Sequence, residues 1–303
     1  MSAGEGILLC RTCGKPRGDN IAEGTRCAAC GRAQALILWI SVSVAAAAST
    51  FARSGEASTA AVSLAVALVV TPVAFVSAVL LHELAHAGAA LLLGQTVTRV
   101  LVGEGVLWKR WGRDFQLVFG SVLLGNGLTT VLDLRHAGYR RRLVVMLLAA
   151  PVVSALLAAT VYIASAGWPA PARTAARLFA LANGVLVVIT SIPIATFNGR
   201  VWSDVAAALW VARASEDEIV EHMLQSARDR MGILLDSGMA VQAIATARAA
   251  VAAQPSASLA HGLLAFALHT AGQSDEARLV ARHALDDGVD DAHRAYLHRF
   301  LES

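Results

Sequence analysis

The sequence predicts a mainly α-helical, polytopic membrane protein with about four transmembrane helices and a small β-rich insertion. Two observations lead to this fold class. The 303-residue chain is 56% hydrophobic and only 16% charged, whereas an average globular chain is about 45–50% apolar. The apolar residues also gather in long runs within the first two thirds of the chain. The net charge of +3 is too small to indicate nucleic acid as a partner.

The N-terminal segment, residues 1–33, carries all four cysteines of the chain. They form two C-x2-C pairs thirteen residues apart, each followed by glycine: Cys10, Cys13, Cys27 and Cys30. Glycine lets the backbone turn so that both sulfurs of a pair face one metal ion, and four thiolates make a closed, structural Zn²⁺ site. We therefore expect a zinc ribbon, with disulfides as the alternative in an oxidising compartment. What the ribbon binds stays open.

Four apolar stretches are candidates for membrane-spanning helices. The first, 35–51, has about seventeen residues, close to the shortest length that crosses a bilayer core. The second, 60–93, is longer than one straight crossing at ~1.5 Å per residue, and Pro72 is expected to kink or split it. The third runs from about residue 143 to 166, and the fourth from 173 to about 194. Residues 35–212 thus form the predicted membrane core.

Residues 95–142 interrupt the apolar pattern and are expected to form a hairpin or a small sheet. Two short runs rich in strand-forming residues, 99–108 and 115–119, lie on either side of a charged link at 109–114. A polar loop is the alternative, since short strands are hard to predict from one sequence.

Lysine and arginine placement predicts the orientation in the membrane. The N-terminal segment, the 95–142 region and the chain beyond Asn198 are basic, whereas the links at 52–58 and 167–172 carry one arginine between them. Four spans with both termini in the cytoplasm satisfy this distribution. The same arrangement places the cysteines on the reducing side, as a thiolate zinc site requires.

Residues 215–303 are predicted to form α-helical repeats, because the composition changes here to charged, alanine-rich amphipathic helices. A shift of 34 residues aligns this region with itself, pairing Gly238 with Gly272, Ala243 with Ala277, Ala247 with Ala281 and Ala250 with Ala284. This period resembles tetratricopeptide repeats, which present a concave face to peptides or partner proteins. An unrelated helical bundle is the alternative.

The sequence His82-Glu83-Leu-Ala-His86 is the strongest chemical signal in the chain. On a helix, HExxH places both imidazoles on one face, where they can bind one Zn²⁺, with Glu83 beside them as a base for the metal-bound water. Ionisable groups in an apolar helix are costly and mark a functional site by default. The alternative is a pair of histidines hydrogen-bonded to neighbouring helices.

A catalytic zinc needs a third protein ligand and an open position. The candidates at a suitable place in the sequence are Asp133, Asn198 and Asp204. Asp133 is expected to be a solvated charge near the predicted strands. Asp204 follows the fourth span and is expected at the cytoplasmic end, level with the HExxH helix. We prefer Asp204, because a carboxylate is a better zinc ligand than the amide of Asn198. Asn198 stays as the alternative.

The segment Val79–Gly94 resembles the first active-site helix of the site-2 protease family (peptidase family M50). That family also has a β-rich region after this helix, as at Thr96–Phe119, and a later span with a Gly-Pro-x-x-Asn-like motif, as at Ala150–Ser154. A final segment with Asn-Leu-x-Pro followed by Asp-Gly is similar to Thr190–Pro193 and Ser203-Asp204. The resemblance covers roughly residues 60–211.

This resemblance implies an intramembrane zinc metalloprotease that hydrolyses peptide bonds of transmembrane protein substrates in regulated intramembrane proteolysis. His82, His86 and Asp204 would hold the catalytic Zn²⁺ and Glu83 would be the catalytic base, beside a second, structural Zn²⁺ in the ribbon. The alternative is a catalytically inert membrane adaptor that binds partner proteins through its ribbon and repeats.

Overall fold

The computed structural model describes residues 57–104, 108–111, 115–120, 122–192 and 203–286, together with a few single positions elsewhere. The four cysteines of the predicted ribbon and Asn198 lie outside the described residues, and within the first candidate span only single positions are described. The chain divides into two compact units.

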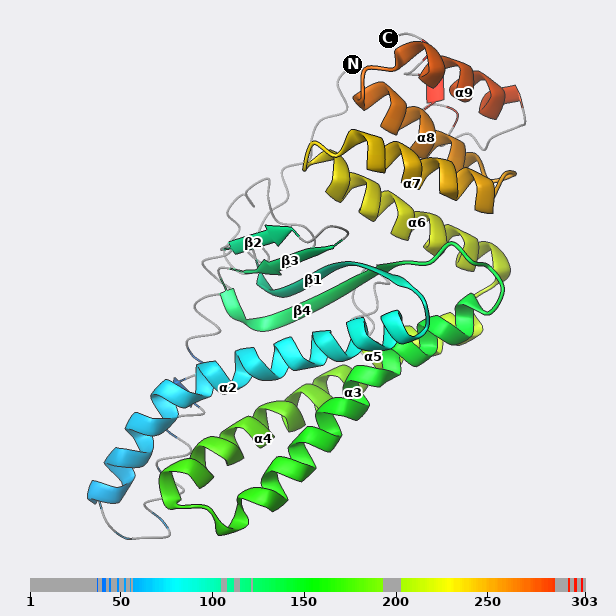
Figure 1. Ribbon diagram of the computed structural model, residues 1–303. Coiled ribbons are helices and arrows are strands. Elements are labelled where there is room, and N and C mark those ends of the chain that lie inside the picture. Colours follow the sequence, from blue (N-terminus) through cyan, green and yellow to red (C-terminus); the bar gives the residue numbers. More distant parts are fainter. Residues whose placement is uncertain are drawn as a thin grey trace. The chain divides into compact units, whose positions relative to one another are not determined.

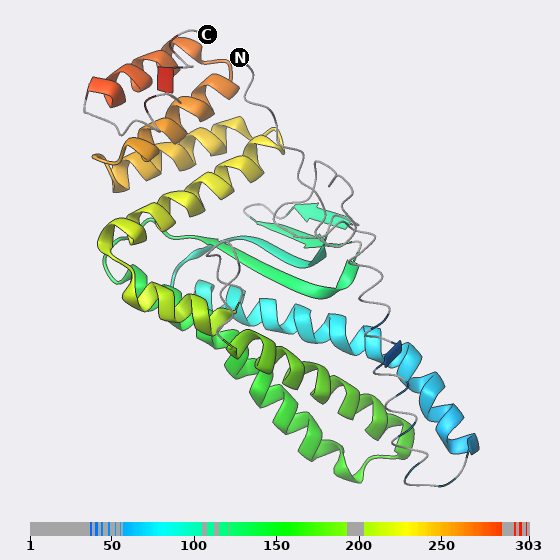
Figure 2. The ribbon, with the colours of Figure 1, turned by 180° about the vertical axis from the view of Figure 1, so that it is seen from behind.

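Among the described residues, three helices are long and apolar enough to cross a membrane, and the first unit holds two of them whole and most of the third. They are α2 (Ala57–Leu92), α3 (Tyr139–Ala164) and α4 (Ala170–Ser191). A short 3-10 turn, Ser165–Gly167, follows α3, and the chain then turns back into α4 (Figure 2). The prediction of a mainly helical protein is therefore confirmed, and three of the four candidate spans are helices that could cross a membrane.

Helix α2 is continuous through Pro72 and is not split by it. Figures 1 and 2 show that its axis bends within its first half, the effect expected of a proline inside a helix. Its second half packs against α4, where Ala78 and Val79 meet Ala182 and Leu186 in one buried cluster. Small side chains on both helices allow this close approach.

A four-stranded sheet with the order β2-β3-β1-β4 follows α2. Its strands are β1 (Thr96–Glu104), β2 (Trp108–Trp111), β3 (Gln116–Phe119) and β4 (Val122–Leu132). Strand β3 pairs parallel with β1 and antiparallel with β2.

The predicted small sheet is thus confirmed, but three of its details differ from expectation. The run 99–108 is divided between two strands, and the link at 109–114 contains most of β2. The longest strand, β4, was not predicted, because its Gly125-Asn126-Gly127 sequence is typical of a turn.

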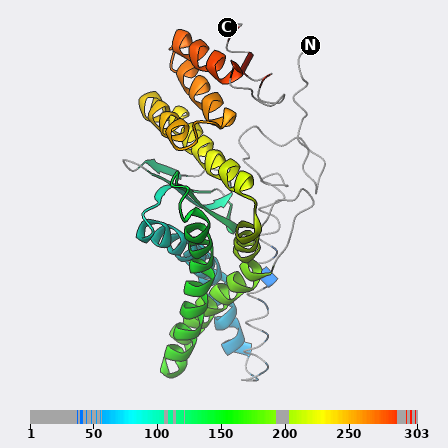
Figure 3. The same cartoon turned by 90° about the vertical axis from the view of Figure 1, so that its right-hand side faces the viewer.

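The second unit contains four consecutive helices, which Figures 1 and 3 show stacked in chain order. They are α6 (Glu216–Leu235), α7 (Ala240–Ala253), α8 (Ser258–Thr270) and α9 (Ser274–Asp286). Helix α6 begins with a capping box, in which the Ser215 side chain accepts from the Glu218 amide and the Glu218 carboxylate accepts from the Ser215 amide. A short helix, α5 (Asp204–Arg213), precedes them.

The 34-residue spacing seen in the sequence is matched by equivalent geometry. Gly238 and Gly272 both follow a helix with positive φ, at 72° and 80°. The alanines that the shift pairs are all buried: Ala243 with Ala277, Ala247 with Ala281, and Ala250 with Ala284. Their assignment to the tetratricopeptide class stays a prediction.

Asp133 is buried, and the expectation of a solvated charge was wrong. Its side chain is 1% exposed and accepts from Arg135 Nε at 2.9 Å and from Arg142 Nε at 2.6 Å. Gln95 Nε2 lies 3.4 Å away. Burial by itself would raise the pKa of Asp133, but the hydrogen bonds from Arg135 and Arg142 outweigh burial and hold the pKa below its ordinary value. The sequence did not show that two nearby arginines fold back onto this carboxylate.

Candidate metal centre

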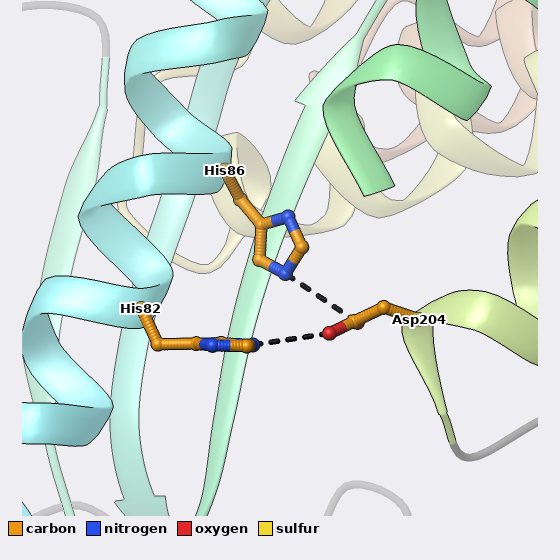
Figure 4. A group of neighbouring side chains, drawn as sticks. All are labelled: His82, His86 and Asp204. Carbon is orange, nitrogen blue, oxygen red and sulfur yellow. Dashed lines mark hydrogen bonds and ion pairs between the residues drawn. The ribbon is translucent and has the colours of Figure 1, made fainter. Parts of the chain in front are cut away.

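Three side chains, His82, His86 and Asp204, come together in the first unit (Figure 4). Nε2 of His82 lies 3.0 Å from Oδ2 of Asp204, and Nε2 of His86 lies 3.4 Å from Oδ1. The three ligand atoms are all within 4.8 Å of one another. The structure therefore brings the preferred third ligand, Asp204, to the HExxH histidines from 118 residues further along the chain than His86.

Each ligand takes its position from the helix that carries it. His82 and His86 are four residues apart on α2, and their rings lie 5.0 Å apart at 89° to each other. Asp204 is the first residue of α5. Ser203 caps that helix, because its hydroxyl accepts from the Ala206 amide at 3.1 Å. A carboxylate is favoured at a helix N-terminus.

The second nitrogen of each imidazole is held by α3. His86 Nδ1 lies 2.9 Å from the carbonyl oxygen of Met146, and His82 Nδ1 lies 3.0 Å from the hydroxyl of Ser154. A carbonyl only accepts, so Nδ1 of His86 carries the hydrogen and the neutral ring has its lone pair on Nε2. Such a partner on the far nitrogen is typical of histidines that bind metal.

This tautomer leaves a place for a cation between His86 and Asp204. In the neutral ring, the lone pair of Nε2 faces a carboxylate oxygen, so two acceptors are directed at each other across 3.4 Å. Only a proton or a metal ion resolves this arrangement. Two imidazole nitrogens and one carboxylate oxygen form a donor set that suits Zn²⁺, and the group can therefore hold a metal ion.

Glu83 is buried on the same helix and contacts strand β4. The hydroxyl of Thr129 donates to Glu83 Oε2 at 2.7 Å. The glycine at 127 leaves the space for this carboxylate, since a Cβ there would lie 2.2 Å from Oε1. The carboxylate is thus fixed between a helix and a strand.

Several residues of this site were not found from the sequence. Gly127 and Thr129 lie on the strand that was not predicted, and Met146 contributes only its backbone. Ser154 is the last residue of the Gly-Pro-x-x-Asn-like motif at Ala150–Ser154, but its contact with His82 was not predicted. Of the other predicted ligands, Asp133 lies in the second unit with its arginines, and Asn198 and the cysteines fall outside the described residues.

Comparison of the chain with models of known protein families, with curated proteins and with solved structures finds no match. Within the described part of the chain, His82, His86 and Asp204 are the one set of three or more His, Cys, Asp or Glu side chains that could hold a metal ion.

Proposed function

We propose that this protein is a membrane-embedded zinc metalloprotease of the site-2 protease type. The observation that carries the proposal is the convergence of His82 Nε2, His86 Nε2 and the Asp204 carboxylate, with both Nδ1 atoms already bonded to α3. Two histidines that only stabilise a helix bundle do not need a carboxylate shared between their free nitrogens.

A zinc ion bound by these three side chains supplies a Lewis acid and lowers the pKa of a bound water toward ~7. The chain itself supplies the base. Glu83 follows His82 directly and lies three residues before His86, so its carboxylate is on the helix that carries both histidines. Thr129 fixes one of its oxygens, and the other is available to accept a proton and later to deliver it to the leaving amine.

The position of the site in the helix indicates the substrate class. His82, Glu83 and His86 are all within the apolar segment Leu64–Leu92, which supports a substrate that enters from the membrane. A transmembrane helix has its backbone hydrogen bonds satisfied internally and must unwind before its peptide bond can be attacked.

The unwound segment is received by strand addition to the sheet. Strands β1 and β3 are internal, whereas β4 is at an edge of the sheet and contacts Glu83 through Gly127 and Thr129. We therefore assign the receiving edge to β4. Prolines placed along β4 should abolish cleavage while zinc stays bound, and intact cleavage in such variants would remove β4 from the mechanism.

The proposal is tested by cleavage of fluorescein-labelled casein, an unfolded substrate, by the purified full-length protein in detergent. The wild type should cleave casein, and Glu83→Gln should retain its zinc and lose at least ~100-fold in rate, the usual contribution of a general base. Glu221→Gln, an exposed glutamate on α6, is the matched control and should cleave normally. Equal rates for Glu83→Gln and the wild type would contradict the proposal.

A second candidate is an inert adaptor, favoured by the stack of helices α6–α9 in a chain that also has three apolar helices. In that case the cellular function would be fully retained in Glu83→Gln. The protease and the adaptor therefore predict different results for the Glu83→Gln variant.

A further inference from the structure

Helix α4 carries two arginines, Arg173 and Arg177, in an otherwise uncharged apolar segment. They are four residues apart and therefore lie on one side of the helix. The chain has no Asp or Glu from residue 134 to residue 203, and within the described residues neither guanidinium donates to a protein acceptor. A charge in an apolar helix is costly without a partner, so a ligand that pairs with these two cations is expected.

The guanidinium of Arg177 lies over the ring of Tyr162 on α3. Its Cζ is 5.4 Å from the ring centroid, a distance at which the face of an aromatic ring attracts a cation. The Nε of Arg177 is buried and has no acceptor, which leaves a donor unsatisfied. The ring thus orients the planar group without satisfying its N–H donors.

Both arginines lie near the turn that joins α3 to α4 (Figure 1). Tyr162 is two residues before the end of α3, and Arg173 is in the first turn of α4. Between them, Trp168 is 47% exposed, and Tyr162 is 57% exposed. Exposed Tyr and Trp at the end of a membrane span belong at the level of the lipid head groups. The long side chain of Arg177 can reach the same level from deeper in the span.

We propose that this end of the α3–α4 hairpin binds the phosphate of an anionic lipid through Arg173 and Arg177. Phosphate oxygens match the N–H fork of arginine, and two cations without an acidic neighbour favour a net negative head group over a zwitterionic one. The proposal rests on α3 and α4 crossing a membrane. The site is separate from the metal group and from the zinc proposed there, the core zinc: Ser154, which bonds to His82, is eight residues before Tyr162, ~12 Å along α3.

Native mass spectrometry of the full-length protein in a neutral detergent tests the proposal. The protein is titrated with dioleoyl phosphatidylglycerol or with dioleoyl phosphatidylcholine, and the wild type should bind the first more tightly. Each basic residue beside an anionic lipid contributes roughly fivefold, so Arg173→Ala/Arg177→Ala should bind phosphatidylglycerol about 25-fold more weakly. Arg228→Ala/Arg282→Ala removes the same charge from exposed positions on α6 and α9 and should bind it as the wild type does.

Equal affinity of the wild type for the two lipids would overturn the inference. Equal affinity of the two double variants for phosphatidylglycerol would also overturn it, because the arginines on α4 would then have no special role. Displacement of phosphatidylglycerol by an excess of inorganic phosphate would show a site for free phosphate instead of a lipid. If the double variant on α4 does not fold, Arg173→Ala alone should lose roughly fivefold, and unchanged affinity in that variant overturns the inference.

Discussion

Oε2 of Glu83 lies 2.7 Å from the hydroxyl of Thr129, 46 residues further along the chain. This hydrogen bond joins the HExxH helix to strand β4. The carboxylate fits only because residue 127 has no side chain. The strand thus determines where the proposed base lies.

Replacing Gly127 by alanine should therefore displace the base. The added Cβ would lie 2.2 Å from Oε1 and 2.5 Å from Cγ of Glu83, so the whole end of the side chain must move. We expect at least a ~10-fold loss of casein cleavage, since a general base must lie within hydrogen-bond reach of its proton. Zinc content should stay at the wild-type value.

Gly184→Ala is the control for this prediction. That glycine lies on α4, and a Cβ there meets nothing within 4 Å, so cleavage should be normal. A Gly127→Ala protein with the wild-type rate would show that the position of Glu83 against β4 is irrelevant to activity.

Ser154→Ala should weaken core zinc binding by removing the partner of His82 Nδ1. Ser154 is fully buried, and the loss of such a partner usually costs 10–100-fold in metal affinity. Chelator competition measures the change. Thr160→Ala, an exposed hydroxyl on the same helix, should leave the affinity unchanged, and equal affinities in the two variants would refute this role of Ser154.

The sequence was most informative where function requires a fixed residue type. HExxH identified two of the three side chains of the candidate metal group and the proposed base, and Asp204 was chosen because its carboxylate follows a span at the expected depth. Strand β4 was not predicted, because the glycine that makes room for Glu83 lies in a Gly-Asn-Gly sequence that is typical of a turn. The burial of Asp133 depends on how Arg142 folds back from the next helix, which is a tertiary contact without a local signal.

Asp133 should stabilise the second unit in a pH-dependent way. Its native pKa is below its ordinary value, so the stabilisation is fully present above about pH 5 and is lost as the pH falls through the native pKa. Asp133→Asn should cost roughly 2 kcal/mol at pH 7, less than a fully buried pair because Arg135 is half exposed.

Thermal unfolding followed by tryptophan fluorescence measures this effect. The difference between wild type and Asp133→Asn should shrink as the pH falls from 7 toward 3. A difference that is the same at every pH would show that the carboxylate charge contributes nothing.

The two glycines related by 34 residues should respond alike to substitution. Gly238 and Gly272 have positive φ, which costs a residue with a Cβ about 1 kcal/mol. Gly238→Ala and Gly272→Ala should therefore each lower the thermal midpoint by a similar amount. Gly232→Ala, inside α6 with nothing near its Cβ, should be neutral or stabilising. Opposite effects at positions 238 and 272 would refute the repeat.

The zinc content of the purified full-length protein tests the central proposal most directly. The wild type should hold about two zinc ions per chain, one in the predicted four-cysteine ribbon and one in the core, and both His86→Ala and Asp204→Ala should hold about one. His136→Ala, an exposed histidine outside the group, should keep both. One zinc in all of these proteins, lost only on replacement of Cys10, would show that the core binds no metal and would contradict the proposal.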